Sequence, residues 1–231
     1  MSNPFSLSFP LLLTAGILLI QAHAETALQS SEQHTKNSHG LSQVAASSYV
    51  RPGHHGMIFE SEDIANIGFI IGTECVAVVD MGGSYTEGMR LLQAIRSLTA
   101  TPICYVINTH VHPDHMLGNK AFQQESTHFV GHQNLPQALG LVGDIFLDRL
   151  QASKHSVQAA TEIIFPDVLV SDTLQLDLGD RKLLLTAHDV AHTAADLSIY
   201  DPKDDVLWTV GVLYSHNIFL YSRLIHPFLM H

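Results

Sequence analysis

Four residues of types that commonly bind metal ions lie within six positions of this chain: His110, His112, Asp114 and His115. In an extended strand, residues i and i+2 point to the same face about 6.6 Å apart, so His110 and His112 can bind one Zn²⁺ through bonds of about 2.0–2.1 Å. Pro113 ends such a strand because it has no N–H to donate. Asp114 and His115 therefore leave on a loop and can turn toward a neighbouring position. The spacing favours a metal centre over the alternative of a surface histidine cluster.

Composition agrees with a metal-binding globular protein. The 231 residues include 16 histidines against 11 Lys and Arg together, and histidine is the commonest protein metal ligand. The 22 Asp and Glu residues give a formal charge of -11, which excludes a generally basic surface for nucleic acid. An apolar share of 46% with 14% charged residues is typical of a globular and not of a disordered chain, and 231 residues make one domain of ordinary size or at most two small ones. Two cysteines exclude a Cys₄ zinc site.

The first 24 residues have the pattern of a signal peptide. They contain no charged side chain, they carry an apolar run over 9–20, and Ala22 and Ala24 supply small residues two positions apart, as at a cleavage site. A membrane span needs about 20 apolar residues, which is longer than this run. We therefore expect cleavage after Ala24 and export, with the periplasm as the expected location. An uncleaved anchor and a misassigned start are the alternatives.

The polar residues 25–48 have no periodicity, and we expect a flexible lead-in to a domain over 49–231. Export would place Cys75 and Cys104 in an oxidising compartment, where they can pair. Each cysteine lies beside a β-branched, apolar run, which favours two buried free thiols. Both states of the cysteines stay open at this point.

Apolar periodicity predicts a mixed α+β domain. Strands are expected over 67–71, 76–80, 103–108, 128–131, 174–178, 182–187, 197–200 and 206–209, and helices over 85–98 and 139–160. Ser84 is placed to cap the first of these helices. The strands at 67–71 and 76–80 form a hairpin in this interpretation. The order strand, helix, strand over 76–108 predicts a crossover between parallel strands.

These segments resemble the metallo-β-lactamase superfamily, whose HxHxDH motif corresponds to residues 110–115. The sequence Asp80-Met-Gly-Gly resembles its Asp-x-Gly turn, and 191–197 resembles the segment that carries its third histidine. The resemblance runs from about residue 50 to residue 209 and implies a four-layer αββα sandwich with the metal groove at one edge. Residues 63–69 and 102–110 resemble more specifically the quinoprotein relay system zinc metallohydrolases, exported proteins associated with pyrroloquinoline-quinone dehydrogenase systems.

The resemblance implies a role for each site residue. A first zinc would be bound by His110, His112 and His192, and a second by Asp114 and His115, with a water or hydroxide between them. Zinc lowers the pKa of bound water toward about 7, so hydroxide can attack a carbonyl at neutral pH. Asp114 would be the catalytic residue that orients the nucleophile and receives its proton. Asp80 would either hold the free N–H of a ligand or cap its own turn.

One departure from the family pattern concerns the last residues. After a strand such as 206–209 the family carries Gly-Asp, whose Asp bridges both metals or serves the second. This chain instead has Val210-Gly211-Val212 and no Asp or Glu after Asp205. We expect an incomplete second half of the fold, caused by a frame shift or by truncation. We also expect one tightly bound zinc, with the second weak or absent.

The sequence therefore predicts a zinc-dependent hydrolase of a small-molecule substrate, with an associated quinoprotein dehydrogenase system and, once the signal peptide is cleaved, no membrane association. The alternatives are a metal-binding accessory protein without turnover and a true β-lactamase. We expect surface or structural roles for the following histidines: His54, His55, His128, His132, His155 and His188. No recognisable segment contains His216, His226 or His231.

Export has a direct test. If Ala24 ends a signal peptide, protein recovered from the periplasm begins at Glu25, which N-terminal sequencing will show. Full-length protein retained in the cytoplasm would contradict the prediction.

Overall fold

The computed structural model describes residues 39–54, 63–124, 126–153 and 160–209. All of them belong to one compact unit of the chain. Several expectations lie outside these ranges: the signal peptide, residues 25–38 of the lead-in, the tail from residue 210 that includes Gly211, and the histidines His55, His155, His216, His226 and His231.

Seven strands form the first sheet in chain order: β1 (Ser42–Gln43), β2 (Ser48–Arg51), β3 (Ile67–Ile71), β4 (Val76–Val79), β5 (Ile103–Ile107), β6 (His128–His132) and β7 (Val168–Val170). The pairs from β1 to β4 are antiparallel, and those from β4 to β7 are parallel. The predicted hairpin and the predicted parallel crossover are both confirmed. The ends of β4, β5 and β6 therefore meet at one edge of this sheet.

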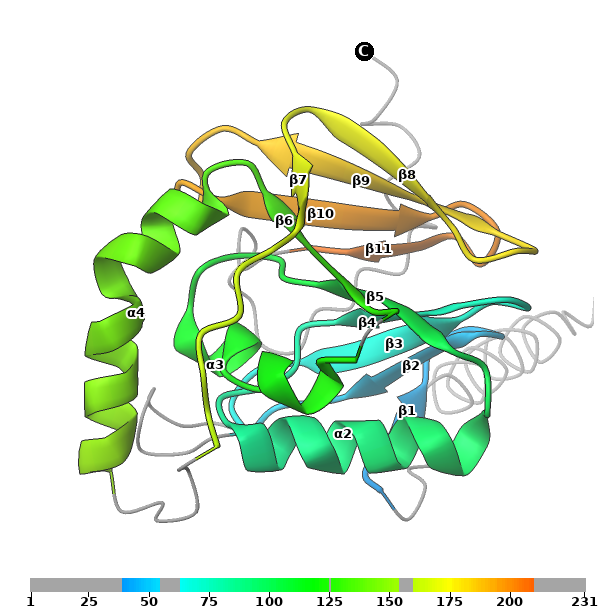
Figure 1. The fold of residues 1–231 in the computed structure, drawn as a ribbon. Coiled ribbons are helices and arrows are strands. Elements are labelled where there is room, and N and C mark those ends of the chain that lie inside the picture. The colour runs from blue at the N-terminus through cyan, green and yellow to red at the C-terminus, as the bar shows by residue number, and fades with distance from the viewer. Residues whose placement is uncertain (1–38, 55–62, 125, 154–159, 210–231) are drawn as a thin grey trace, which may run out of the picture. The chain divides into compact units, whose positions relative to one another are not determined.

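Four antiparallel strands form the second sheet in the order β11-β10-β9-β8: β8 (Thr173–Asp177), β9 (Lys182–His188), β10 (Asp196–Asp201) and β11 (Val206–Trp208). In β9, in β11 and from Leu197 onward in β10, buried side chains alternate with more exposed ones, as expected where one face of a sheet covers a core. Those side chains pack against the first sheet in one shared cluster: Leu176, Leu183, Leu185, Leu197, Ile199 and Trp208 meet Val50, Ile70, Ala77, Val79 and Ile107. The two sheets form a sandwich (Figure 1).

The helix α2 (Tyr85–Leu98) covers the other face of the seven-stranded sheet (Figure 1). Its bounds agree with the prediction, and the hydroxyl of Ser84 caps it by accepting from the Glu87 N–H at 3.2 Å. Leu91 and Ile95 are fully buried against this sheet. Three further helical segments follow: α3 (Pro113–Met116), the 3₁₀ helix η1 (Asn119–Phe122) and α4 (Leu135–Ala152).

The bounds of one helix and of the lead-in were predicted wrongly. The second long helix was expected over 139–160, but α4 begins at Leu135 and ends at Ala152. Pro136 lies in its first turn, where proline is favoured because that N–H has no helical partner. Residues 39–48, assigned to the flexible lead-in, contribute β1 and the start of β2, and Leu41 is buried. The few apolar residues of this polar stretch, Leu41 and Val44 among them, have no periodicity that would reveal their burial.

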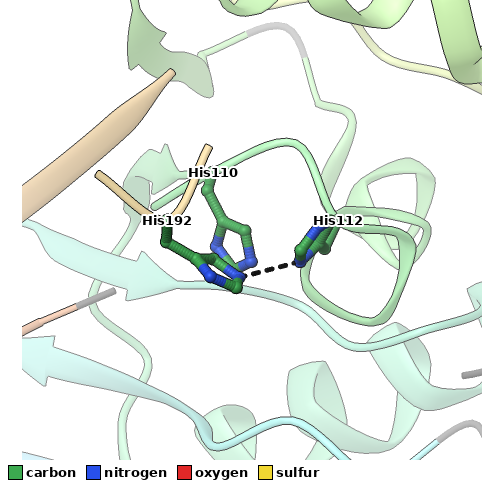
Figure 2. A group of neighbouring side chains, drawn as sticks. All are labelled: His110, His112 and His192. Carbon is green, nitrogen blue, oxygen red and sulfur yellow. Dashed lines mark hydrogen bonds between the residues drawn. The ribbon is translucent and has the colours of Figure 1, made fainter. Parts of the chain in front are cut away.

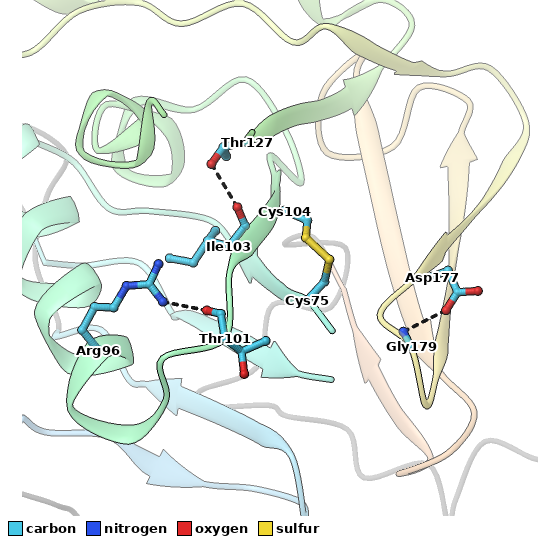
Figure 3. Close-up of a disulfide and its surroundings, with 8 residues drawn as sticks. All are labelled: Cys75, Arg96, Thr101, Ile103, Cys104, Thr127, Asp177 and Gly179. Carbon is cyan, nitrogen blue, oxygen red and sulfur yellow. Dashed lines mark hydrogen bonds between the residues drawn. A yellow bond between two sulfur atoms is a disulfide. The ribbon is translucent and has the colours of Figure 1, made fainter. Parts of the chain in front are cut away.

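Of the two states left open for the cysteines, the favoured one, two free thiols, is wrong, because Cys75 and Cys104 form a disulfide (Figure 3). Cys75 directly precedes β4 and Cys104 lies in β5, its parallel neighbour. Their Cα atoms are 5.5 Å apart, within the usual range for a bridge. The apolar runs beside the cysteines therefore mark adjacent strands, and the bridge fastens the two strands at the end opposite to the histidine motif.

The α+β class and the two-sheet sandwich are confirmed. Three layers of the expected αββα arrangement lie within the described residues: α2, the seven-stranded sheet and the four-stranded sheet. Among the same residues, no helix combines the length and the apolar character that crossing a membrane requires.

Reduction of the disulfide should lower the free energy of unfolding by about 3–4 kcal/mol, because the reduced unfolded chain regains the entropy of a loop with a separation of 29 residues. Urea unfolding with and without reductant measures this difference. A Cys75→Ala/Cys104→Ala variant should be insensitive to reductant. Equal midpoints for oxidised and reduced wild-type protein would contradict the assignment.

Candidate metal centre

The segment after β5 brings His110 into the interior of the protein. Asn108 continues the strand, since its N–H donates to the Val130 carbonyl at 2.9 Å. The side chains of Asn108 and Asn119 exchange two amide hydrogen bonds of 3.2 and 2.9 Å, and both are fully buried. This exchange fixes the end of β5 against η1. His110 follows with an exposure of 1%.

Three imidazoles meet at this point (Figure 2). His110 and His112 come from the segment after β5, and His192 comes from the connection between β9 and β10. Their nearest ligand atoms lie within 4.8 Å of one another, and His192 Nε2 is 3.0 Å from His112 Nδ1. Two nitrogens on one tetrahedral zinc are about 3.3 Å apart, so the three rings are close to ligand geometry.

One potential ligand atom of these three histidines has no hydrogen-bond partner. His110 Nε2 is buried without a hydrogen bond. The other ring nitrogen, Nδ1, lies 3.0 Å from the hydroxyl of Thr109, which itself donates to Asp80 Oδ2 at 2.7 Å. Because that hydroxyl uses its proton on Asp80, it accepts from His110 Nδ1–H, and the lone pair of His110 faces the site from Nε2. A buried lone pair without a donor fits a metal ion.

Asp80 supports this arrangement from the end of β4. Its Oδ1 accepts the Thr109 N–H at 2.9 Å, and its Oδ2 accepts from Thr109 Oγ1 and from His115 Nδ1, each at 2.7 Å. Asp80, His110 and His115 also form a group compact enough to bind an ion. Three hydrogen bonds already engage the Asp80 carboxylate. Of the two predicted roles, this geometry matches that of holding the free N–H of a ligand.

The turn that presents Asp80 is held on several sides. Asp80 has a left-handed backbone, with φ of 53°, and Gly82 follows with φ of 88°, a conformation that glycine adopts without strain. The Gly83 N–H donates to the buried carboxylate of Glu87 at 2.8 Å, and Glu87 pairs with Arg51 of β2. The Met81 N–H donates to the carbonyl of His115 at 2.9 Å. The turn is thereby tied to α2, β2 and α3.

Asp114 and His115 lie beside the three histidines. They were expected on a loop, but Pro113 instead starts the one-turn helix α3, which contains both. His115 Nε2 is 3.3 Å from Asp114 Oδ2, and Asp114 Oδ1 is buried without a partner. The ring centroid of His115 is 4.2 Å from that of His110. The pair therefore offers ligand atoms for a second ion next to the first position.

Electrostatics differ between the two positions. Burial, followed by the neighbouring histidines, holds the pKa of His110 well below its ordinary value and also lowers that of His112, so both rings are neutral, as metal ligands must be. Burial opposes charge on His115, but Asp80 and Asp114 together outweigh it and raise its pKa to about 10. For Asp114, burial is likewise outweighed by His115, and the pKa is lowered. The carboxylates therefore favour positive charge at this second position.

Four other described histidines have structural partners. His188 Nε2 contacts Ser198 Oγ at 2.8 Å within the four-stranded sheet. His128 contacts Asp167 and His54 contacts Asp63 at the surface, and the buried His132 accepts the Asn134 N–H. Within the described ranges, none of these four joins a cluster of potential metal ligands. The role of Thr109 was not predicted from the sequence, because its only signal is a hydroxyl directly before the motif.

Residues 61–209 match the family model of the metallo-beta-lactamase superfamily. The match covers more than half of the chain and includes the three central histidines, Asp80, Asp114 and His115. The chain belongs to the metallo-beta-lactamase superfamily.

Individual relatives have diverse activities. The acyl-coenzyme A thioesterase MBLAC2 of Bos taurus is 25% identical over 188 residues, which make up 72% of this chain and 65% of that protein. Among solved structures, the sec-alkylsulfatase Pisa1 of Pseudomonas sp. aligns with a TM-score of 0.56 at 18% identity, covering 73% of this chain and 30% of its own. A metallo-beta-lactamase of Pontibacter korlensis aligns with a TM-score of 0.52 at 16% identity, covering 72% of this chain and 68% of its own. The two structures share the fold with this chain.

Replacement of His110 by Ala should abolish tight zinc binding, because it removes a buried ring nitrogen that faces the site without a partner. The matched control is His188→Ala, which removes a nearby histidine engaged by Ser198 and should leave zinc binding unchanged. Metal analysis after dialysis compares the variants. Equal zinc loss in both would contradict the assigned ligand set.

Proposed function

We propose that this chain is a zinc-dependent hydrolase, with His110, His112 and His192 holding the first ion. The buried Nε2 of His110, which has no protein partner, is the observation that carries the proposal. Two more imidazoles converge on it, and the chemistry of three neutral histidines suits Zn²⁺. When bound, zinc lowers the pKa of a coordinated water and polarises a carbonyl oxygen.

Asp114 is the residue that we assign to proton transfer. Its Oδ2 faces His115, while its Oδ1 is buried and has no partner. Against the effect of burial, His115 lowers the pKa of Asp114, so the carboxylate is ionised at neutral pH. Its unpartnered Oδ1 is the oxygen that can orient an attacking water and accept its proton. Asp114 and His115 would also hold a second ion. Within the described residues this position has two ligands against three at the first, so we propose one tightly held zinc and a second that dialysis removes.

Thioesters are the first substrate class to test. The curated relative is a thioesterase by name, and a thioester presents the carbonyl that the proposed chemistry requires. A β-lactam presents a carbonyl too, and the fold is shared with a β-lactamase. Comparison of thioester and chromogenic cephalosporin hydrolysis, with and without added zinc, separates these activities. A metal-binding accessory protein would bind zinc and turn over neither.

The cellular setting is proposed in the same way. The Cys75–Cys104 disulfide supports export, because such bridges persist in oxidising compartments such as the periplasm. It is independent of the apolar run at residues 9–20 from which export was predicted. A role beside a quinoprotein dehydrogenase system, with a small-molecule substrate, rests on the resemblance of residues 63–69 and 102–110 and belongs to the proposal alone.

Asp114→Asn should lower zinc-dependent hydrolysis by about 100-fold or more, since an amide cannot accept a proton as a carboxylate does. The first zinc should remain bound, because its three histidines are untouched. Steady-state rates and zinc content are measured together, with the exposed Asp144→Asn on α4 as control. An unchanged rate in Asp114→Asn would mean that the activity arises elsewhere.

A further inference from the structure

The third histidine of the first metal position comes from a different sheet than the other two. His110 and His112 follow β5 of the seven-stranded sheet, whereas His192 lies in residues 189–195 between β9 and β10, here called the His192 loop. One backbone hydrogen bond joins the two parts at the site, from the Leu197 N–H to the Thr109 carbonyl at 2.8 Å. Metal–ligand distances tolerate errors of about 0.2 Å, so further contacts must fix this loop.

Asp196 fixes the loop from within. This carboxylate is fully buried at the start of β10. Its Oδ2 accepts the backbone N–H groups of His192 at 2.7 Å and of Thr193 at 2.9 Å, and its Oδ1 accepts the Thr193 hydroxyl at 2.5 Å. The backbone of the ligand residue itself is therefore held by a charge-assisted hydrogen bond.

Asn134 fixes the loop from outside. It is the N-cap residue of α4, a position where asparagine normally accepts from its own helix, yet its side chain makes no such hydrogen bond. Its Nδ2 instead donates to the Ala194 carbonyl at 2.9 Å, 60 residues further along the chain. The backbone of Asn134 is in turn held by the buried ring of His132, whose Nδ1 accepts the Asn134 N–H at 3.0 Å.

Apolar packing accompanies these hydrogen bonds. Ala195, at the end of the loop, is fully buried in a cluster with Leu135 and Leu139 of α4 and with Met116 of α3. The same cluster includes the half-buried Val111, which lies between His110 and His112. The first turns of α4 therefore contact both segments that supply the histidines.

We propose that Asn134 and Asp196 are positioning residues that clamp the His192 loop, so that the ring of His192 faces His110 and His112. The inference rests on the proposed function, because the ion held there is the zinc of the first position. Asp196 sets the conformation of the loop, and Asn134 sets its distance from the β6–α4 junction. The clamp makes zinc affinity depend on a residue that touches neither the ion nor a ligand side chain.

A double-mutant cycle on zinc affinity tests the clamp. Asn134→Ala should weaken zinc binding about 10-fold, the lower end of the range for groups that support metal ligands, as measured by competition with a chromophoric chelator. In a His192→Ala background the same change should have no further effect, because the clamp acts through His192. An equal loss in both backgrounds would overturn the proposal, and so would an unchanged affinity in Asn134→Ala.

Two variants separate positioning from helix stability. Asn134→Asp retains a favourable N-cap residue but cannot donate to the Ala194 carbonyl, so it should weaken zinc binding without lowering the unfolding temperature. Gln133→Ala, which removes the neighbouring exposed amide, should change neither quantity. Normal zinc affinity in Asn134→Asp would overturn the role assigned to the donor.

The clamp can also be observed without metal. In zinc-free protein, Asn134→Ala should speed hydrogen exchange at the backbone amides of His192 and Thr193, which donate to Asp196. Unchanged exchange would overturn the clamp even if the wild-type chain is an active zinc enzyme. If the wild-type chain binds no zinc, the proposed function fails, and hydrogen exchange alone then decides whether Asn134 orders the loop.

Discussion

The carboxylate of Asp80 is the interaction on which the candidate site depends. It accepts three hydrogen bonds, from the backbone and hydroxyl of Thr109 and from the ring of His115. Through Thr109, Asp80 directs the lone pair of His110 into the site. By accepting from Nδ1 of His115, it also turns Nε2 of the His115 ring toward Asp114. One side chain at the end of β4 therefore orients one ligand of each proposed metal position, which requires β4 and β5 to keep their parallel register.

The rest of the fold maintains this register and closes the site. The disulfide fastens β4 to β5 at their far end, and the buried exchange between Asn108 and Asn119 fixes the end of β5. The four-stranded sheet then supplies His192 from across the sandwich. Because the third histidine comes from a separate layer, the geometry of the metal position depends on the packing of the two sheets as well as on the local motif.

Local sequence patterns predicted those parts of the site that local geometry determines. The spacing of His110, His112, Asp114 and His115 follows from one strand end, and the family motif located His192 and the Asp80 turn. Asn134 had no comparable signal, since its bond to Ala194 spans 60 residues and replaces the capping role that its type favours. The disulfide was missed for a related reason: periodicity identified both strands, but nothing in it placed Cys75 beside Cys104.

The central claim is that His110, His112 and His192 bind one metal ion together. Anomalous diffraction at the zinc absorption edge, from crystals of the full chain grown with one equivalent of zinc, tests it most directly. The account predicts one strong anomalous peak within bonding distance of His110 Nε2, of about 2.0–2.1 Å, with His112 and His192 as further ligands. A strong peak at other residues, or zinc bound without His110, would contradict it.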